Sequence, residues 1–311
     1  MDPSLDAVIR EVEKAVVGKR AVIEKVLTAL LAGGHILLDD VPGVGKTTLA
    51  VAVSRALGLN YRRIQFTPDV LPSDIVGFSM YDRETGTFRY VPGVASEANL
   101  LLGDEINRAG SKTQSALLEA MEEGQVTVDG TVHPLLNPFC VIATQNQVGT
   151  AGTQPLPQAQ LDRFLVRLTI GYPDYESEIE LIRDRQRENP LDSVRQVSSL
   201  ADVLAMRDAV RAVHMDDEIV SYITRLAAAS REHPALLLGI SPRGALSVSR
   251  MSKALACLRG RDYVIPEDVR DIFPDVCAHR VLLSQKARLE RLGADGVMAE
   301  LLSDVKLPHM I

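Results

Sequence analysis

Short apolar runs alternate with amphipathic helical patterns between residues 35 and 170. The apolar runs are HILL at 35–38, NLLLGDE at 99–105, FCVIAT at 139–144 and FLVRLTI at 164–170, and helical periodicity covers 46–57 and 112–123. Strands that alternate with helices predict a parallel sheet with helices on both faces. In such sheets, ligands bind beyond the carboxyl ends of the strands. We therefore expect any functional site at that edge.

Two segments interrupt this alternation and have the pattern of hairpins. In FSMYDRETGTFRYVPG, residues 78–93, a RETG turn separates two β-rich runs. In GQVTVDGTVHPL, residues 124–135, Asp129-Gly130 lies between alternating positions. Asp-Gly in this setting is a strong hairpin signal because both residues tolerate positive φ. The sequence thus predicts two hairpins inserted into the α/β region.

The two ends of the chain are helical in pattern. Residues 1–34 predict two amphipathic helices around VVGK, and beyond residue 171 the apolar positions recur with a period of 3.6. The helices predicted there cover 174–188, 200–213, 216–231 and 241–258. We therefore expect an α/β core at 1–170, N-terminal helices included, and a second, all-α domain at 171–311.

Composition indicates a soluble protein of the cytoplasm. The 311 residues are 46% hydrophobic and 24% charged, and the longest apolar stretches are far too short to cross a membrane. The N-terminus has no pattern typical of an export signal. Cys140, Cys257 and Cys277 are scattered without a C-x-x-C pair, so we expect neither disulfides nor a zinc site. We expect no membrane insertion.

Charge argues against nucleic acid as the main partner. The formal net charge is −7, and no basic tail or patch is visible in the sequence. Tight binding to a phosphate backbone depends on clustered Lys and Arg. A ring could still line its pore with a few basic residues, so a nucleic-acid motor stays open as the alternative.

The segment DDVPGVGKTT at 39–48 follows the HILL strand and opens a helix. It fits the second half of the phosphate-loop template, in which backbone N–H groups at a helix N-terminus hold phosphate. Lys46 supplies a positive charge for the β- and γ-phosphates, and Thr47 supplies a hydroxyl for Mg²⁺. Asp40 stands where the template has glycine, so its carboxylate must point away from the phosphates. The predicted nucleotide-binding loop is Val41, Pro42, Gly43, Val44, Gly45, Lys46, Thr47 and Thr48.

A second candidate lies at the end of the strand in ANLLLGDEINRAG, residues 98–110. The strand ends in two carboxylates at the predicted ligand-binding edge. We expect Asp104 to face Mg²⁺ and Glu105 to face an attacking water. Alone this pattern is common, but 57 residues after a G-K-T loop it indicates an ATPase.

The chain resembles the MoxR family of AAA+ ATPases along essentially its whole length. The stretches that carry the resemblance are VPGVGKT, QFTPDVLPSDIVG, DEINRAGSKTQSALLEAMEEGQVTVDG, FCVIATQN, PLPQAQLDRF and SPRGAL. The resemblance implies an α/β ATPase core, a helical lid and a homo-oligomeric ring, usually a hexamer, with ATP and Mg²⁺ as cofactors. It identifies 78–93 as the helix-2 insert and 124–135 as the pre-sensor-1 hairpin. It also makes Asp40 a family variation of the loop.

The resemblance assigns catalytic roles to three residues outside these two motifs. Asn146 in ATQN matches sensor 1, which helps to orient water against the γ-phosphate. Arg163 in LDRF matches the arginine finger that reaches a neighbouring subunit's nucleotide, although Arg167 is a rival four residues on. Arg243 in SPRG matches sensor 2.

One further match to the family and one departure from it concern the segments at 17–18 and 147–160. Val17 and Gly18 in VVGK occupy the segment that packs near adenine in this class. Between sensor 1 and the finger, this chain reads QVGTAGTQPLPQAQ at 147–160 and lacks the acidic, Tyr-containing stretch common in the family. The six histidines show no spacing typical of metal ligands, so we expect surface or capping roles for them.

Three functions agree with these features to different degrees. MoxR-type rings remodel or mature other proteins, often with von Willebrand factor A domain partners, and this resemblance favours an ATP-driven chaperone. A nucleic-acid motor is disfavoured by net acidity and by the scarcity of aromatic residues, six Phe and seven Tyr with no Trp. A switch that binds but hardly hydrolyses ATP is disfavoured because Glu105, Asn146 and Arg163 are all present. The client is not readable from the sequence.

Overall fold

The computed structural model of the chain describes residues 3–145, 155–184 and 189–308. A five-stranded sheet lies at its centre, with strand order β2-β5-β8-β1-β9 and parallel pairing throughout. The strands are β1 (Ile36–Asp39), β2 (Tyr61–Gln65), β5 (Leu100–Asp104), β8 (Cys140–Gln145) and β9 (Val166–Leu168). The four strands predicted from apolar runs are confirmed, and β2 is an additional strand at the edge.

Side chains of the central strands alternate between two apolar layers. Ile36 and Leu38 of β1 belong to the cluster that contains the first helices, α1 (Pro3–Glu13), α2 (Arg20–Leu31) and α3 (Lys46–Leu57). Leu37, which points to the opposite face, belongs to the cluster with α4 (Pro72–Val76) and α5 (Ser111–Glu123). The predicted arrangement of helices on both faces of the sheet is therefore confirmed.

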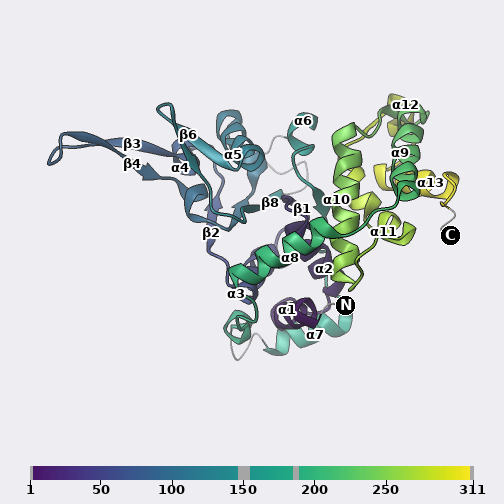
Figure 1. Cartoon of the computed structure of the whole chain (residues 1–311), viewed down its shortest axis with the longest axis horizontal. Helices are drawn as coiled ribbons and strands as arrows, with labels where there is room; N and C mark the ends of the chain where they lie inside the picture. The colour runs from purple at the N-terminus through teal and green to yellow at the C-terminus, as the bar shows by residue number, and fades with distance from the viewer. Residues whose placement is uncertain (1–2, 146–154, 185–188, 309–311) are drawn as a thin grey trace.

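Both predicted hairpins are present. The first pairs β3 (Gly77–Asp82) with β4 (Thr87–Pro92), and the second pairs β6 (Gln125–Val128) with β7 (Thr131–Pro134). Asp129 and Gly130 both have positive φ, 49° and 77°, as the Asp-Gly turn predicts. The β3–β4 hairpin extends far from the sheet at one end of the molecule (Figure 1).

The helices of the C-terminal part are α8 (Leu200–Ala212), α9 (Asp217–Glu232), α10 (Pro242–Leu258), α11 (Pro266–Cys277), α12 (Gln285–Leu289) and α13 (Ala294–Asp304). Of these, α8 lies across the middle of the molecule, whereas α9, α11, α12 and α13 gather at the other end of the long axis (Figure 1). A short antiparallel pair, β10 (Leu236–Leu238) with β11 (Leu282–Leu283), lies among them, so this region is helical but not purely so. The domain division at residue 171 stays a prediction.

The remaining elements are short or lie between those already described. They are α6 (Gln158–Leu161), α7 (Tyr175–Asp184) and three 3₁₀ turns, η1 (Val94–Glu97), η2 (Ile106–Arg108) and η3 (Pro190–Ser193). The described part of α7 covers most of the helix predicted at 174–188. Within the described residues, no helix combines the length and the apolar character that crossing a membrane requires.

Candidate nucleotide site

The loop between β1 and α3 has the backbone of a phosphate-binding turn. Gly43 and Gly45 have φ values of 86° and 93°, in the region that favours glycine. Gly45 is also the N-cap residue of α3, so the free N–H groups of the first helical turn open toward the loop. Such a helix N-terminus attracts anions through its N–H groups and its dipole.

A pocket of about 330 Å³ lies over this helix end. Six of the predicted loop residues line it, and β2, β5 and β8 contribute the others. The lining residues are Pro42, Gly43, Gly45, Lys46, Thr47, Thr48, Arg63, Gln65, Asp104, Glu105 and Thr144. The loop and the two acidic residues predicted from sequence therefore meet at one edge of the sheet, while Val41 and Val44 lie in the loop without lining the pocket.

Asp40 points away from this pocket, as expected. Its Oδ2 accepts hydrogen bonds from the backbone N–H groups of Ile170 at 2.7 Å and Gly171 at 2.6 Å, and its Oδ1 accepts one from Val41 at 2.7 Å. The residue is 4% exposed. The carboxylate thus joins the start of the phosphate loop to the end of β9, and its charge is directed away from any bound phosphate.

Lys46 is held in place by two backbone carbonyls. Its Nζ donates to the carbonyl oxygen of Asp40 at 2.6 Å and to that of Gln145 at 3.2 Å. Burial lowers the pKa of Lys46, and the nearby carboxylates of Asp40 and Asp39 oppose that shift. The ammonium is therefore anchored beside the helix N-terminus, within the pocket where phosphate would bind.

Asp104 is paired with an arginine that the sequence did not single out. Arg63 Nε donates to Asp104 Oδ2 at 2.7 Å, and Thr144 Oγ1 donates to Asp104 Oδ1 at 3.2 Å. The register of β2 against β5 places Arg63 beside this strand end. The Asp104 side chain is 9% exposed, and that of Arg63 is 49% exposed. The pocket thus has a second cation beside Lys46.

Glu105 has an uncommon backbone conformation. Its φ of 58° is in the left-handed region, which non-glycine residues rarely adopt and which is concentrated at functional sites. Its N–H donates to Thr144 Oγ1 at 2.9 Å, and its carboxylate pairs with Arg108 Nη1 at 2.7 Å. This turn places Glu105, the residue directly after β5, in the lining of the pocket.

These residues fit a magnesium nucleotide. Mg²⁺ prefers oxygen ligands and is usually bound by one or two protein oxygens together with phosphates and water. The Thr47 hydroxyl and the Asp104 carboxylate line the same pocket as the phosphate loop and supply such oxygens. These two residues would hold the ion, which would neutralise charge on the phosphates.

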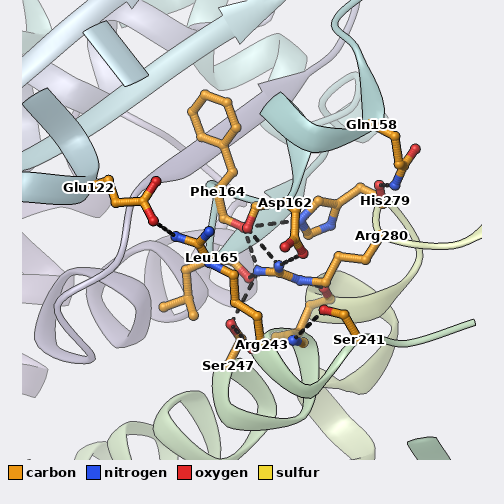
Figure 2. Close-up of polar contacts among 12 residues, drawn as sticks. Glu122, Gln158, Asp162, Phe164, Leu165, Ser241, Arg243, Ser247, His279 and Arg280 are labelled. Carbon is orange, nitrogen blue, oxygen red and sulfur yellow. Dashed lines mark hydrogen bonds and ion pairs between the residues drawn. The ribbon is translucent and has the colours of Figure 1, made fainter. Parts of the chain in front are cut away.

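The predicted finger and sensor 2 come together outside this pocket. Arg163, which follows α6, and Arg243, in the first turn of α10, contact the two oxygens of one carboxylate, that of Glu122. The distances are 2.8 Å from Arg163 Nε to Oε2 and 3.0 Å from Arg243 Nη2 to Oε1. Figure 2 shows this junction between the core and the lid. Neither arginine lines the phosphate-loop pocket of its own chain.

Arg167, the rival finger, has a different environment. It lies on β9, with Nη1 3.9 Å from Asp39 and Nη2 3.9 Å from Asp295. Asp295 belongs to α13 of the lid, so Arg167 lies between strand and lid, away from the pair on Glu122.

Three further predicted site residues lie apart from this pocket or outside the described chain. Asn146 is outside the described residues. Gly18 has a φ of 70° in the turn between α1 and α2, and a Cβ at this position would come within 2.3 Å of Ser177 Oγ on α7. Val17 precedes it. Their predicted place beside adenine stays a prediction.

The expectation of surface or capping roles for the histidines is wrong for two of them. His35 is 8% exposed, and its Nε2 donates to the Met121 carbonyl at 2.9 Å while its Nδ1 accepts from Val141 N–H at 3.0 Å. His279 is 3% exposed and bonds the Phe164 carbonyl at 3.1 Å. Both histidines join separate segments in the interior, which spacing along a sequence cannot reveal.

Comparisons with known proteins agree with this geometry. The model of the ATPase family associated with various cellular activities (AAA) matches residues 35–166, and that of the AAA lid domain matches residues 228–301. The first match contains the phosphate loop and both carboxylates. The fold and the site thus define an AAA+ ATPase.

Relatives match nearly the whole chain. Uncharacterized protein YeaC of Bacillus subtilis is 44% identical, over 99% of this chain and 96% of its own length. Chaperone MoxR1 of Mycobacterium tuberculosis is 39% identical, over 99% of this chain and 83% of its own length. A solved structure of a candidate ATPase from Cytophaga hutchinsonii has a TM-score of 0.91 at 39% identity and covers 98% of this chain and 95% of its own. The chain belongs to the MoxR family of AAA+ ATPases.

Proposed function

We propose that this ATPase hydrolyses Mg·ATP at sites shared between adjacent copies in a homo-oligomeric ring, a hexamer by family resemblance. We propose further that the ring uses this energy to remodel or mature client proteins. The observation that carries the first proposal is the separation of the arginine pair from the phosphate loop of the same chain.

The pocket over the phosphate loop has one arginine in its described lining, Arg63, and that residue is paired with Asp104. Arg163 and Arg243 share Glu122 at the junction with the lid instead. Phosphoryl transfer requires cations against the charge that develops on the γ-phosphate, and an arginine supplied by a neighbour is a common source. Two arginines presented together suit the nucleotide of an adjacent copy.

In such a shared site, each residue has a distinct task. Lys46 and the N–H groups of the loop bind the phosphates, and Thr47 and Asp104 hold the ion. Glu105 polarises the attacking water as general base, and Asn146 orients it. Arg163 and Arg243 come from the neighbouring copy and stabilise charge on the γ-phosphate.

Two features support protein clients. One relative of high similarity is named a chaperone. In addition, the extended β3–β4 hairpin carries exposed large side chains, among them Phe78 at 47%, Tyr81 at 53% and Phe88 at 73% exposure. Exposed apolar side chains that gather on one element are typical of protein-interaction surfaces. We propose a von Willebrand factor A domain protein as the partner, on family resemblance alone.

The dependence of turnover on assembly tests the shared site. Specific ATPase activity should rise with protein concentration, in parallel with the ring population seen by native mass spectrometry. ATP binding by the unassembled chain should persist, because the phosphate loop is complete within one copy. Equal specific activity in samples that contain only monomers would contradict the proposal.

A further inference from the structure

Glu122 lies at the end of its helix where a carboxylate destabilises the helix. It lies in the last turn of α5, the end at which the helix dipole is negative and an acidic side chain is unfavourable. Its side chain is 35% exposed and contacts two arginines. These contacts with Arg163 lower the pKa of Glu122, and Arg243 adds to the shift. The carboxylate is therefore ionised, and its favourable interactions are with the two arginines rather than with its own helix.

The two contacts of Glu122 orient the arginines without occupying them fully. Among the described residues, Arg163 makes its hydrogen bond through Nε, and its guanidinium has two further nitrogens that can donate. Arg243 makes its contact with Glu122 through Nη2. A carboxylate that competed with phosphate would instead take a bidentate pair from one arginine. The geometry at Glu122 suits a side chain that sets the direction of both guanidiniums while their other N–H groups stay open.

Asp162 and Phe164, the residues on either side of Arg163, are held by a separate, buried arginine of the lid, Arg280 (Figure 2). Arg280, whose side chain is 2% exposed, pairs with the carboxylate of Asp162 and donates to the carbonyl of Phe164 at 2.6 Å. It also contacts Ser247 Oγ of α10 at 3.3 Å. The residues on either side of Arg163 and the helix that carries Arg243 are thus tied together. Glu122, in contrast, contacts the guanidiniums of Arg163 and Arg243 and so bears on the directions of these side chains.

The surroundings of the pair favour an anion. A small pocket of about 150 Å³ at this junction is lined by four arginines and two acidic residues, in addition to polar and apolar groups. Its charged residues are Arg163, Arg243, Arg250, Arg280, Glu122 and Asp162. Positive charge therefore exceeds negative charge here even with Glu122 ionised, and the surface stays attractive to a phosphate.

We propose that Glu122 is a positioning residue of the shared ATP site, which fixes the relative directions of Arg163 and Arg243 for the γ-phosphate of the adjacent copy. The inference rests on the proposed function, because it requires that these arginines act on a neighbour's nucleotide. Glu122 itself does not line the phosphate-loop pocket of its own chain.

The test compares Glu122→Ala and Glu122→Gln with Glu123→Ala, which removes the adjacent exposed acid of the same helix end. The kcat and KM for ATP are measured on samples that native mass spectrometry shows to be assembled. Glu122→Ala should lower kcat about tenfold to a hundredfold, since misdirected catalytic groups have effects of this size, with KM within about twofold of the parent. Glu122→Gln should be intermediate, because one amide oxygen accepts from one arginine while the amide N–H₂ faces the other.

Three further results separate the possible explanations. Melting temperatures should stay within about 2 °C of the parent, because partly exposed ion pairs contribute little stability. If Glu122→Ala does not assemble, the isosteric Glu122→Gln carries the same comparison. In the double variant with Arg163→Ala, Glu122→Ala should add little further loss, because residues that act as a unit are not additive.

Unchanged or raised kcat in both Glu122 variants would overturn the positioning role, and a rise would mean that the carboxylate withholds the arginines. A fall in kcat that the Glu123→Ala control reproduces would also overturn it. If Arg163→Ala itself keeps parental turnover, the shared site fails. If Arg163→Ala is inactive while the Glu122 variants are normal, only the positioning role fails.

Discussion

The guanidinium of Arg63 donates a hydrogen bond of 2.7 Å from Nε to Oδ2 of Asp104, at the strand end that faces the phosphate loop. Asp104 is the residue proposed to hold Mg²⁺, so a fixed cation shares its carboxylate. Like charges near one another oppose each other's binding, and here the effect is moderated by the 49% exposure of the Arg63 side chain.

Arg63→Ala should therefore lower the Mg²⁺ concentration at half-maximal ATPase activity, by about twofold to tenfold. The measurement is turnover against free Mg²⁺ at saturating ATP. Arg62→Ala is the matched control, because Arg62 is the preceding residue on β2 and contacts Glu97 instead. An unchanged or higher half-saturating concentration for Arg63→Ala would contradict this account of the pair.

Asp40→Ala should destabilise the fold while leaving phosphate binding measurable. The substitution leaves three backbone N–H groups without their acceptor, two of them at the end of β9. We expect the free energy of unfolding to fall by about 3 kcal/mol, measured by urea denaturation. The control Asp39→Ala removes a long contact with Arg167 and an attraction to Lys46, and it should change stability by less than about 1 kcal/mol.

If the Asp40 carboxylate instead lay beside the phosphates, the results would be reversed. In that case, Asp40→Ala would tighten ATP binding and leave the free energy of unfolding unchanged.

Glu105→Gln should bind ATP as the parent does but hydrolyse it about 10²- to 10⁴-fold more slowly. The amide keeps the shape of the side chain but cannot polarise water as a carboxylate does. Single-turnover phosphate release measures the chemical step, and a fluorescent ATP analogue measures binding. Glu119→Gln, on the exposed face of α5, is the control. Phosphate release within a few-fold of the parent would assign the activating role to another residue.

The stability of the fold should decrease as pH falls below about 6.5. Burial lowers the pKa of His35 to about 4, and Arg207 and Arg250 add smaller effects in the same direction. Burial likewise lowers the pKa of His279 to about 3. An unfolded histidine takes up a proton near pH 6.5, and the folded chain does so only at the lower pKa. The contribution is thus complete above pH 6.5 and is lost as pH falls toward the folded values.

By pH 5, each histidine should reduce the free energy of unfolding by about 2 kcal/mol. Urea denaturation between pH 8 and pH 5 measures the slope. In His35→Gln, which cannot titrate, the slope should be about half that of the parent. The same slope in parent and variant would show that His35 is not the titrating group.

Much of the fold follows from local patterns. Helix α3 has the predicted bounds because Gly45 and Gly58 at its two ends both have left-handed backbone. The central strands β5 and β8 are apolar runs because both of their faces are covered. Strand β2 escaped prediction because YRRIQ is charged and lies at the edge of the sheet, where its side chains are mostly exposed.

The chemical motifs were also readable, since the phosphate loop and the Asp104-Glu105 pair are contiguous in sequence. The roles of Arg63 and Glu122 could not be predicted from the sequence. The importance of Arg63 comes from the pairing of β2 with β5, which brings its side chain to Asp104. The importance of Glu122 comes from Arg163 and Arg243, which are distant in sequence and contact its carboxylate in the folded chain. No local pattern marks either residue, because their roles depend on contacts between distant segments.

The account places the arginine finger of one copy at the nucleotide of the next. Arg163→Ala should bind ATP normally but lose turnover about 10³- to 10⁵-fold, and Arg167→Ala should be much milder. Lys46→Ala should not bind ATP tightly, because it lacks the ammonium anchored beside the phosphate loop. A greater loss in Arg167→Ala than in Arg163→Ala would transfer the finger to Arg167.

Mixing the two inactive variants tests this claim most directly. A shared site regains function where the intact loop of an Arg163→Ala copy meets the intact finger of a Lys46→Ala copy. ATPase activity is measured on the mixture while native mass spectrometry reports its mixed rings. The account predicts partial recovery of turnover, well above that of either variant alone. A mixture that stays inactive although mixed rings are present would contradict it.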